Sequence, residues 1–250
     1  KRKKIKGKKM KKQIMSLLLL NSLVMSDSLE LEVGFNYATD KTLSGMVSSN
    51  GTEIDVVEDL NLEKLGNNQG EGWINLKHFV PILPNIKIEN SESHYYGEST
   101  LSKEITFLGF VFTISQDVIS EMHMEKQDLT PYYNVLDLDL LSVDLGVSLR
   151  SLDGMIAVGD KVETIKEVIP MFYTEITSNP TDSLKLSGQV KYLNIDGDKI
   201  EEKKGTISYD IWKGLNIDVA YKSEEIDIEV DGSKIKIEEE TSLVGLSYRF

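Results

Sequence analysis

Three histidines are the residues best suited to acid–base or metal chemistry, and one of them lies between two glutamates. Glu121, His123 and Glu125 occupy every second position, so an extended strand would present all three on one face. Such a face could bind a metal ion or place a carboxylate beside an imidazole for proton transfer. Alternating Glu and His are more common on a solvated strand face. The sequence therefore assigns no catalytic, cofactor-binding or metal-binding residue, and no enzyme is predicted.

Two further sequence features argue against a calcium-binding loop and against cysteine-based sites. Asp196-Gly197-Asp198 lacks the further spaced oxygen ligands of a calcium-binding loop and predicts a turn. Cysteine is absent, which excludes a disulfide framework and a thiolate metal site.

The C-terminal residues alternate strictly between apolar and other side chains. Val244, Leu246, Tyr248 and Phe250 share one face of the predicted strand. This pattern resembles the closing strand of bacterial outer-membrane β-barrels, in which the insertion machinery reads a terminal Phe with an aromatic residue two places earlier. The resemblance implies that these four residues are a barrel-insertion signal, with the barrel-assembly machinery as a partner during insertion.

The first 26 residues have the composition of a secretory signal peptide. Nine of the first thirteen residues are Lys or Arg, and an apolar run of 12 residues, Ile14–Met25, follows. This run is shorter than the roughly 20 residues of a spanning helix. Cleavage is expected at Ser26 or Ser28, so that residues 27–250 form the folded domain.

Removal of residues 1–26 would leave a strongly acidic domain. The formal charge of the whole chain is −13, and loss of nine basic residues changes it to −22. Binding to nucleic acid is thereby disfavoured. Outer-membrane lipids and lipopolysaccharide are the predicted partners, with divalent cations between the acidic protein and the phosphates.

Residues 1–9 are interpreted as upstream read-through, with Met10 as the initiator.

The remaining sequence predicts strand after strand. Apolar and polar residues alternate with a period of two in ten segments. These are residues 29–37, 74–77, 86–89, 118–126, 141–150, 168–176, 184–192, 205–212, 215–221 and 242–250. The predicted fold is all-β, a closed antiparallel transmembrane β-barrel of about ten strands, within a range of 8 to 12. Twelve strands would result if Ile105–Phe112 formed an extra strand that pairs back through residues 115–117.

The links between these segments alternate in length. Short turns are predicted at residues 81–85, 179–182 and 212–214, with a somewhat longer link at 130–137. Long polar links are predicted at residues 40–71, 97–117, 153–166, 195–204 and 223–241. Short periplasmic turns and long external loops are typical of outer-membrane barrels. The first long link carries Ile54, Val56, Leu60, Leu62 and Leu65, which favour a lid over the barrel mouth.

Fifteen charged residues are predicted to face the lumen. They are Glu30, Glu32, Lys77, Lys87, Glu89, Glu121, Glu125, Asp144, Arg150, Lys185, Lys191, Asp210, Asp218, Lys222 and Arg249. A Lys or Arg facing lipid near the mid-plane costs roughly 2–4 kcal/mol, so these charges belong inside. A soluble lipid-binding barrel with an apolar interior is the alternative. The predicted signal peptide and closing strand favour the membrane barrel, whose sheet must close because hydrocarbon offers no partner to an edge.

The opposite charges and the aromatic residues lead to two further expectations. Eight acids and seven bases would fill a narrow barrel with ion pairs; a narrow solute channel is the alternative. Trp73, Tyr132, Tyr133, Tyr192 and Trp212 lie near predicted strand ends and predict an aromatic girdle at the membrane interfaces.

Three segments resemble a family of functionally uncharacterised outer-membrane β-barrel proteins of Gram-negative bacteria. They are His78 with Pro81-Ile82-Leu83-Pro84-Asn85, the stretch from Tyr132-Tyr133 through Arg150 to Gly154, and Ile169-Pro170-Met171-Phe172-Tyr173. Where the family usually has Glu-His-Pro, this chain has Lys77-His78-Phe79. The resemblance implies a barrel and an outer-membrane location, and it implies no activity.

The sequence thus predicts an integral outer-membrane barrel with a structural or surface-exposed role and a charge-filled narrow lumen. A porin-like solute channel is the second hypothesis. An outer-membrane hydrolase or lipid-modifying enzyme is the third. No cofactor is predicted.

Overall fold

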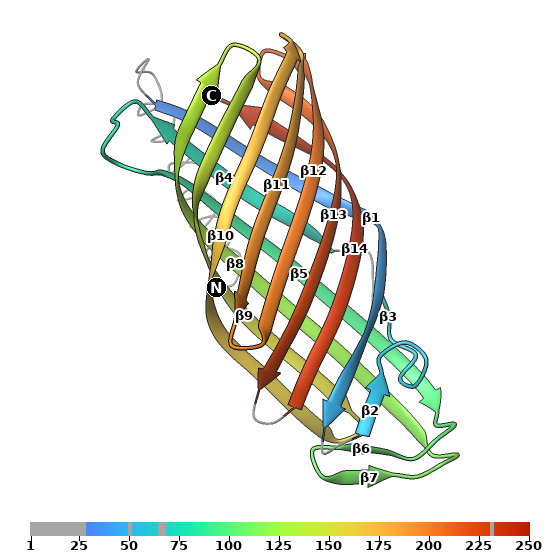
Figure 1. Ribbon diagram of the computed structural model, residues 1–250. Helices are drawn as coiled ribbons and strands as arrows, with labels where there is room; N and C mark the ends of the chain where they lie inside the picture. The colour runs from blue at the N-terminus through green and yellow to red at the C-terminus, as the bar shows by residue number, and fades with distance from the viewer. Residues whose placement is uncertain (1–28, 50–51, 65–68, 231–232) are drawn as a thin grey trace, which may run out of the picture.

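The computed structural model is an antiparallel β-barrel that closes on itself (Figure 1). It describes residues 29–49, 52–64, 69–230 and 233–250, so the predicted signal peptide lies outside the described residues. The last wall strand pairs with the first over most of its length, and this pairing closes the sheet. Closure removes the sheet edges, whose backbone groups lipid could not satisfy.

Ten strands form the wall, each pairing with its neighbours in chain order. They are β1 (Leu29–Ser49), β4 (Gly70–His78), β5 (Asn85–Thr100), β8 (Asp117–Leu138), β9 (Leu141–Val158), β10 (Lys161–Thr181), β11 (Leu184–Ile195), β12 (Asp198–Trp212), β13 (Leu215–Val230) and β14 (Ser233–Arg249). The predicted fold class and the count of ten are confirmed.

Four short strands lie outside the ten. β2 (Thr52–Asp55) pairs with β1, and β3 (Glu63–Lys64) pairs with β5. β6 (Ile105–Phe107) and β7 (Phe110–Phe112) form a separate hairpin. The twelve-strand alternative is therefore wrong, because this hairpin pairs with itself and not with the wall. Among the described residues, no helix is long and apolar enough to cross a bilayer.

An apolar belt surrounds the end of the barrel that carries the C-terminus. Outward side chains such as Leu129, Leu149, Val168, Val219 and Leu246 are 40–70 % exposed. On β8 the belt covers residues 129–138, which matches the roughly 9–11 residues that a tilted strand needs to cross a bilayer. We refer to this end as periplasmic and to the opposite end as external, since an even number of strands brings both termini to the periplasmic side.

The wall strands continue far beyond the belt. β8 has 22 residues and β10 has 21, about twice a membrane crossing. At the external end, two-residue turns at 159–160 and 196–197 join successive strands. The predicted links at residues 130–137, 153–166, 195–204 and 223–241 are therefore wrong, because most of these residues belong to strands. Of the other two predicted long links, residues 52–64 and 101–116 lie in the external half.

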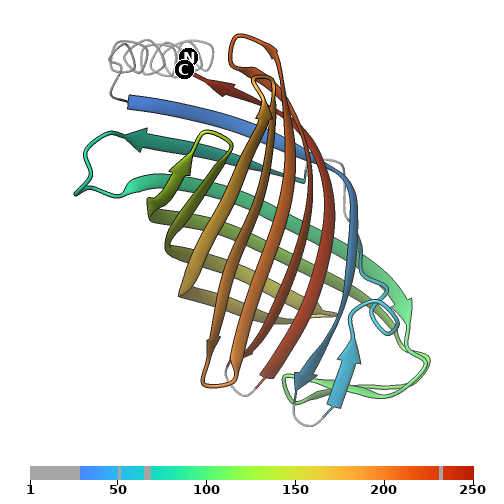
Figure 2. The ribbon, with the colours of Figure 1, turned by 45° about the horizontal axis from the view of Figure 1, so that its top comes forward.

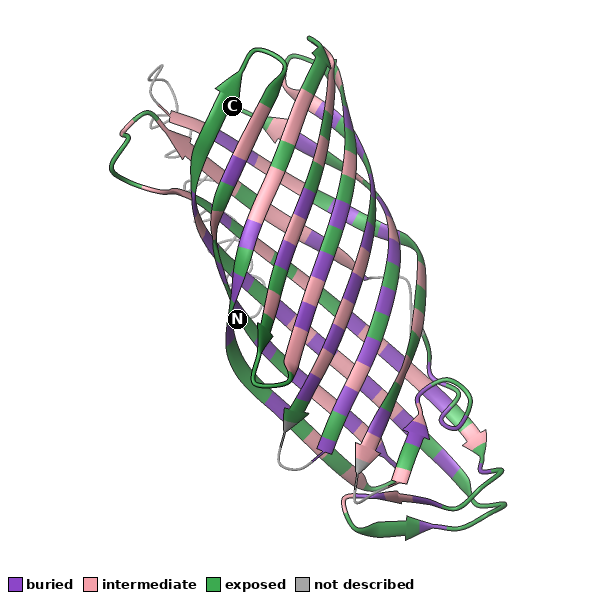
Figure 3. Ribbon diagram, in the orientation of Figure 1, coloured by how far each residue is buried: buried purple, intermediate pink, exposed green. Residues whose placement is uncertain are grey.

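Buried and exposed residues alternate along the wall strands (Figure 3), but the chemical character of the inward and outward faces is exchanged where the strands leave the belt. Beyond it, outward positions carry charges, as Lys199, Glu201 and Lys203 do on β12. Inward positions carry apolar side chains instead, such as Ile226 and Ile237, which are 3 % and 2 % exposed. The external half is thus built like a water-soluble protein around a hydrophobic core. The sequence-based prediction assumes that the apolar residues of every strand face outward. In the external half they face inward, so that assumption led to the wrong prediction of loops there.

The same reversal means that the inward and outward faces predicted for residues 118–126 of β8 are wrong. Met122 and Met124 point into the hydrophobic core, with 0 % and 5 % exposure. Glu121, His123 and Glu125 therefore lie on the outer surface of the external half. The prediction that Glu121 and Glu125 are lumen charges is wrong, because above the belt the apolar side chains of this strand fill the interior.

The segment between β1 and β4 fills a gap in the wall and does not form the predicted lid. β4 has 9 residues, whereas its neighbours β1 and β5 have 21 and 16. Beyond the external end of β4, β2 pairs with the rest of β1, and β3 pairs with β5. Four apolar side chains of this segment join the core at 0–2 % exposure, namely Ile54, Val56, Leu60 and Leu62. Leu65 lies outside the described residues.

The β6–β7 hairpin covers the external end of the barrel (Figures 1 and 2). Ile105, Phe107 and Phe112 are 0–6 % exposed and belong to the same core as the wall residues. The hairpin therefore closes the mouth by burying apolar side chains.

Ile156→Ala should destabilise the barrel by about 2–4 kcal/mol, because Ile156 is 2 % exposed in the external core. Ile119→Ala removes the same atoms at an outward position that is 56 % exposed, and should change stability by less than about 0.5 kcal/mol. Urea unfolding of the refolded variants in lipid bilayers, followed by tryptophan fluorescence, measures both. Equal losses would contradict a packed core in the external half.

Candidate functional site: the ion-pair layer and the cavity beneath it

An ion-pair layer crosses the barrel interior at the external edge of the apolar belt. It contains seven carboxylates and seven cationic side chains, and each of the ten wall strands contributes at least one. Its members are Lys41, Glu71, Lys87, Glu89, Lys126, Asp128, Arg150, Glu175, Lys191, Glu202, Lys204, Lys222, Glu224 and Glu239. The layer is formally neutral and connects strands that are far apart around the wall.

Arg150 of β9 lies at the centre of this layer and is 1 % exposed. Its guanidinium donates two hydrogen bonds to Asp128, at 2.8 and 2.7 Å. It also donates to Glu202 and to Glu224, each at 2.5 Å. The planar guanidinium has five N–H donors in a fixed fork, which suits it to three surrounding carboxylates.

Two lysines compensate the excess negative charge around Arg150. Lys191 Nζ lies 2.5 Å from Asp128 Oδ2, 2.6 Å from Glu89 Oε2 and 3.2 Å from Glu202 Oε1. Lys126 contacts Glu224. Because these carboxylates are shared between cations, the charges form one continuous network.

The network reaches β1 and β14 through Glu239. Lys41 Nζ lies 3.0 Å from this carboxylate, and the Tyr95 hydroxyl donates to it at 2.9 Å. Glu239 is 2 % exposed, and its contacts with Lys41 and Lys126 compensate its charge.

Two further groups complete the layer. Lys87 donates to Glu175 at 3.0 Å and to Gln189 at 2.5 Å, and the Tyr173 hydroxyl donates to Glu175 at 2.5 Å. Glu71 contacts Lys204 and lies 3.4 Å from Lys222.

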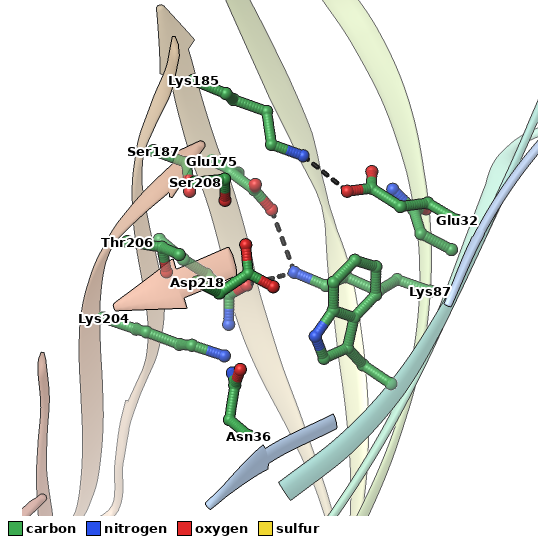
Figure 4. A pocket seen from close by; sticks show the side chains of 13 residues that line it. Glu32, Asn36, Lys87, Glu175, Lys185, Ser187, Lys204, Thr206, Ser208 and Asp218 are labelled. Atoms are coloured by element: carbon green, nitrogen blue, oxygen red, sulfur yellow. Dashed lines mark hydrogen bonds and ion pairs between the residues drawn. The ribbon is translucent and has the colours of Figure 1, made fainter. Parts of the chain in front are cut away.

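A polar cavity lies between the ion-pair layer and the periplasmic end (Figure 4). It has a volume of about 50 Å³, and its lining includes Trp73, Lys87 and Asp218. Lys185 donates to Glu32 at 2.6 Å across it. The Trp73 ring lies over Gly34, where an added Cβ would be 2.5 Å from the indole, so the glycine makes room for the ring.

Some aromatic residues do not lie where the sequence predicts. Trp73 lines the cavity and Tyr132 is 1 % exposed, with its hydroxyl donating to Asn75 at 2.7 Å. These two are therefore not part of an interfacial girdle, because both occupy inward positions. Tyr133, Tyr192 and Trp212 are 38–67 % exposed on the outer surface.

The predicted lumen charges other than Glu121 and Glu125 divide into three groups. Lys87, Glu89, Arg150, Lys191 and Lys222 belong to the ion-pair layer, as described above. Glu32, Lys185 and Asp218 line the cavity. The others lie toward the periplasmic end: Glu30 and Lys77 are register partners on β1 and β4, Asp144 accepts a hydrogen bond from Asn134, and Asp210 and Arg249 line a pocket at the mouth.

Nine members of the layer were not singled out by sequence reasoning. Six of them, such as Glu224 and Glu239, fall in segments that the sequence assigns to loops. Lys126 and Asp128 share the face of β8 with the methionines. The sequence feature that could have identified these residues is the alternation that continues beyond the predicted strand ends. Asp218, Lys222 and Glu224, for example, occupy even positions of one uninterrupted strand.

The four residues of the predicted insertion signal end the last wall strand. Val244, Leu246 and Phe250 are 39–55 % exposed on the belt, and the Tyr248 ring meets the Phe250 ring edge-on at 4.7 Å. Their recognition by the insertion machinery stays a prediction.

Arg150→Met should destabilise the barrel by about 3–5 kcal/mol, because it leaves Asp128, Glu202 and Glu224 buried without their shared partner. Lys166→Met removes an ion pair to Asp153 at 3.0 Å on the outer surface, where both side chains are more than half exposed. That control should cost at most about 1 kcal/mol. The stability of both variants is measured as the temperature at which heating removes the band of folded protein from a gel. Similar temperatures for the two variants would show that the layer is not the stabilising element.

No family model matches this chain, and no curated protein matches it in sequence. Among solved structures it is similar to the outer membrane protease OmpT from Escherichia coli, with a TM-score of 0.52 and 12 % identity over 90 % of this chain and 98 % of that chain. The translocator domain of the autotransporter NalP from Neisseria meningitidis has a TM-score of 0.42 and 12 % identity, over 98 % and 96 % of the two chains. Ail from Yersinia pestis has a TM-score of 0.37 and 11 % identity, over 89 % and 99 %.

At this level of identity the similarity concerns the fold alone. The closed antiparallel wall, the apolar belt and the similarity to OmpT together show that this chain has the fold of a bacterial outer-membrane β-barrel, as the sequence predicts.

Proposed function

We propose that this protein is a closed, non-conducting barrel of the outer membrane that carries a rigid platform above the membrane surface. The filled interior is the observation that supports this proposal. In the ion-pair layer, Lys126, Arg150 and Lys191 are 1–2 % exposed, and the external core above it is equally buried. A continuous aqueous path would expose the side chains along its wall, so the burial of both layers argues against a porin-like channel.

The external half has the properties of a platform. On β8, residues 117–128 continue beyond the belt, which corresponds to roughly 30 Å above the membrane for a tilted strand. Its core excludes water, and its outer face is charged. A packed core resists deformation, so this half would hold any surface that it presents in a fixed position.

The histidines do not support an enzyme. His94 Nε2 lies 2.6 Å from Glu121 Oε1, and His123 Nε2 lies 3.3 Å from Glu92 Oε1. Both pairs lie on the outer face of β5 and β8, with side chains 28–55 % exposed. General acid–base catalysis needs a His and a carboxylate positioned around a bound substrate, and an exposed strand face does not enclose one.

Planar-bilayer recordings test the closed interior. The refolded wild-type protein should give no conductance steps above the baseline, because the ion-pair layer and the external core both block the lumen. A general porin inserted into the same bilayers serves as the positive control, and protease protection establishes that the test protein is inserted. Reproducible steps in the wild-type protein would reject the proposal in favour of a channel.

We also propose that lipopolysaccharide contacts the outer surface just above the belt through divalent cations. A groove across β1, β12, β13 and β14 is lined by Glu201, Glu225, Glu238 and Glu240, together with Lys203. Glu201, Glu225 and Glu238 already contact lysines, whereas no ion pair is found for Glu240 among the described residues. Hard divalent cations, which prefer oxygen ligands, would allow the acidic residues of this groove to lie beside lipid phosphates. This arrangement supports the partners that the acidic composition predicts.

Chelation tests this contact. Removal of divalent cations should lower the temperature at which the wild-type protein in lipopolysaccharide-containing membranes loses its heat-modifiable band. The double variant Glu238→Gln/Glu240→Gln should respond less to the chelator, because its groove has fewer anionic ligands. Asp182→Asn, in a periplasmic turn, should respond like the wild type. An unchanged mobility of the wild-type protein after chelation would rule out bridging.

A further inference from the structure

Asp218 of β13 is a buried carboxylate without a partner. It is 2 % exposed, and neither of its oxygens has a hydrogen-bond partner. The ion pairs found among the described residues do not include it, and its side chain points into the cavity beneath the ion-pair layer (Figure 4). An uncompensated carboxylate in such a place is costly, so the cavity calls for a positive species beside it.

A second unpartnered oxygen lies on the same side of this cavity. Asn36 Nδ2 donates to Glu71 at 3.0 Å, while Asn36 Oδ1 has no partner. In the register of the sheet, Gly245 separates Asn36 from Asp218. A Cβ on Gly245 would lie 2.1 Å from Asn36 Oδ1, so the missing side chain leaves the space over this strand open to the two polar groups.

The lysines of the cavity are already neutralised by other acids. Lys87 lies 3.0 Å from Glu175, and Lys185 lies 2.6 Å from Glu32. Lys204 contacts Glu71. The charge of Asp218 is therefore the one left over at this site, and a single positive charge would balance it.

The cavity has room for a ligand and adjoins the periplasmic mouth. Its volume of about 50 Å³ corresponds to roughly three or four water-sized bodies. Lys185 and Ser208 also line the pocket at the mouth, which contains Asp139, Asp182 and Asp210. Carboxylates at an entrance raise the local concentration of cations.

We propose that this cavity binds an alkali-metal cation, taken from the periplasmic side, with Asp218 and Asn36 Oδ1 as ligands. Hydroxyl groups of Thr206 and Ser208 line the same space and can complete an oxygen shell together with water. A monovalent ion fits the single surplus charge, and oxygen ligands select a hard cation. The ion would neutralise the charge of Asp218, which no ion pair among the described residues balances.

Thermal unfolding of the folded protein in detergent tests the proposal, with NaCl compared against choline chloride at the same ionic strength and pH. Na⁺ should raise the unfolding midpoint of the wild type in a saturable manner. Asp218→Asn should abolish this dependence. Asp153→Asn, which removes an exposed carboxylate on the outer surface, should retain it. Asn36→Ala keeps the charge of the site but removes one ligand, and should raise the half-saturating Na⁺ concentration by about tenfold.

Thallium(I), an alkali-cation substitute with an anomalous X-ray signal, locates the ion directly in wild-type crystals, so the proposal can be judged even if Asp218→Asn fails to fold. A thallium peak beside Asp218 would support it. Equal midpoints in Na⁺ and choline, together with no peak in the cavity, would overturn it. An Asp218→Asn variant as stable as the wild type under those conditions would show that Asp218 carries a proton instead and would overturn the proposal. Retention of the Na⁺ effect in Asp218→Asn would place the site elsewhere and overturn the proposal too.

Discussion

The contact of Arg150 with three buried carboxylates is the interaction on which the interior of this barrel depends. Backbone hydrogen bonds join each strand only to its two neighbours, whereas Arg150 on β9 reaches Asp128 on β8, Glu202 on β12 and Glu224 on β13. A buried charge is tolerated only when it is paired, so each carboxylate must sit within hydrogen-bond distance of its cation. The layer thereby fixes opposite sides of the wall relative to one another.

The position of this layer follows from the two solvents around the barrel. Within the belt, lipid requires apolar side chains outside, and the polar residues of each strand turn inward. Beyond the belt, water surrounds the wall, and the apolar residues turn inward to form a core that includes Met122 and Ile237. The ion-pair layer lies where the polar interior ends and the apolar interior begins. In this order, ion pairs fill the interior at the level of the layer, and apolar side chains fill it beyond the belt.

The proposed functions follow from this sealed interior. A lumen that is closed at its middle and at its external end suits a surface platform more than a conduit. The cavity beneath the ion-pair layer lies toward the periplasm, and Asp218, which has no ion pair among the described residues, gives it a specific chemistry. External and periplasmic ends would therefore act independently, because the ion-pair layer separates them.

The alternation with a period of two, as in Val244, Leu246 and Tyr248, was enough to predict the fold class, the ten strands and the outward face of the belt, because it depends only on local geometry. It did not determine where strands end, since alternation is the same whether apolar residues face lipid or a core. Glu125 and Met124 show this: their order fits either assignment, and only closure of the wall around the external core decides it. The ion pairs were equally out of reach, because Arg150 and Glu224 are 74 residues apart and meet only once the barrel is closed.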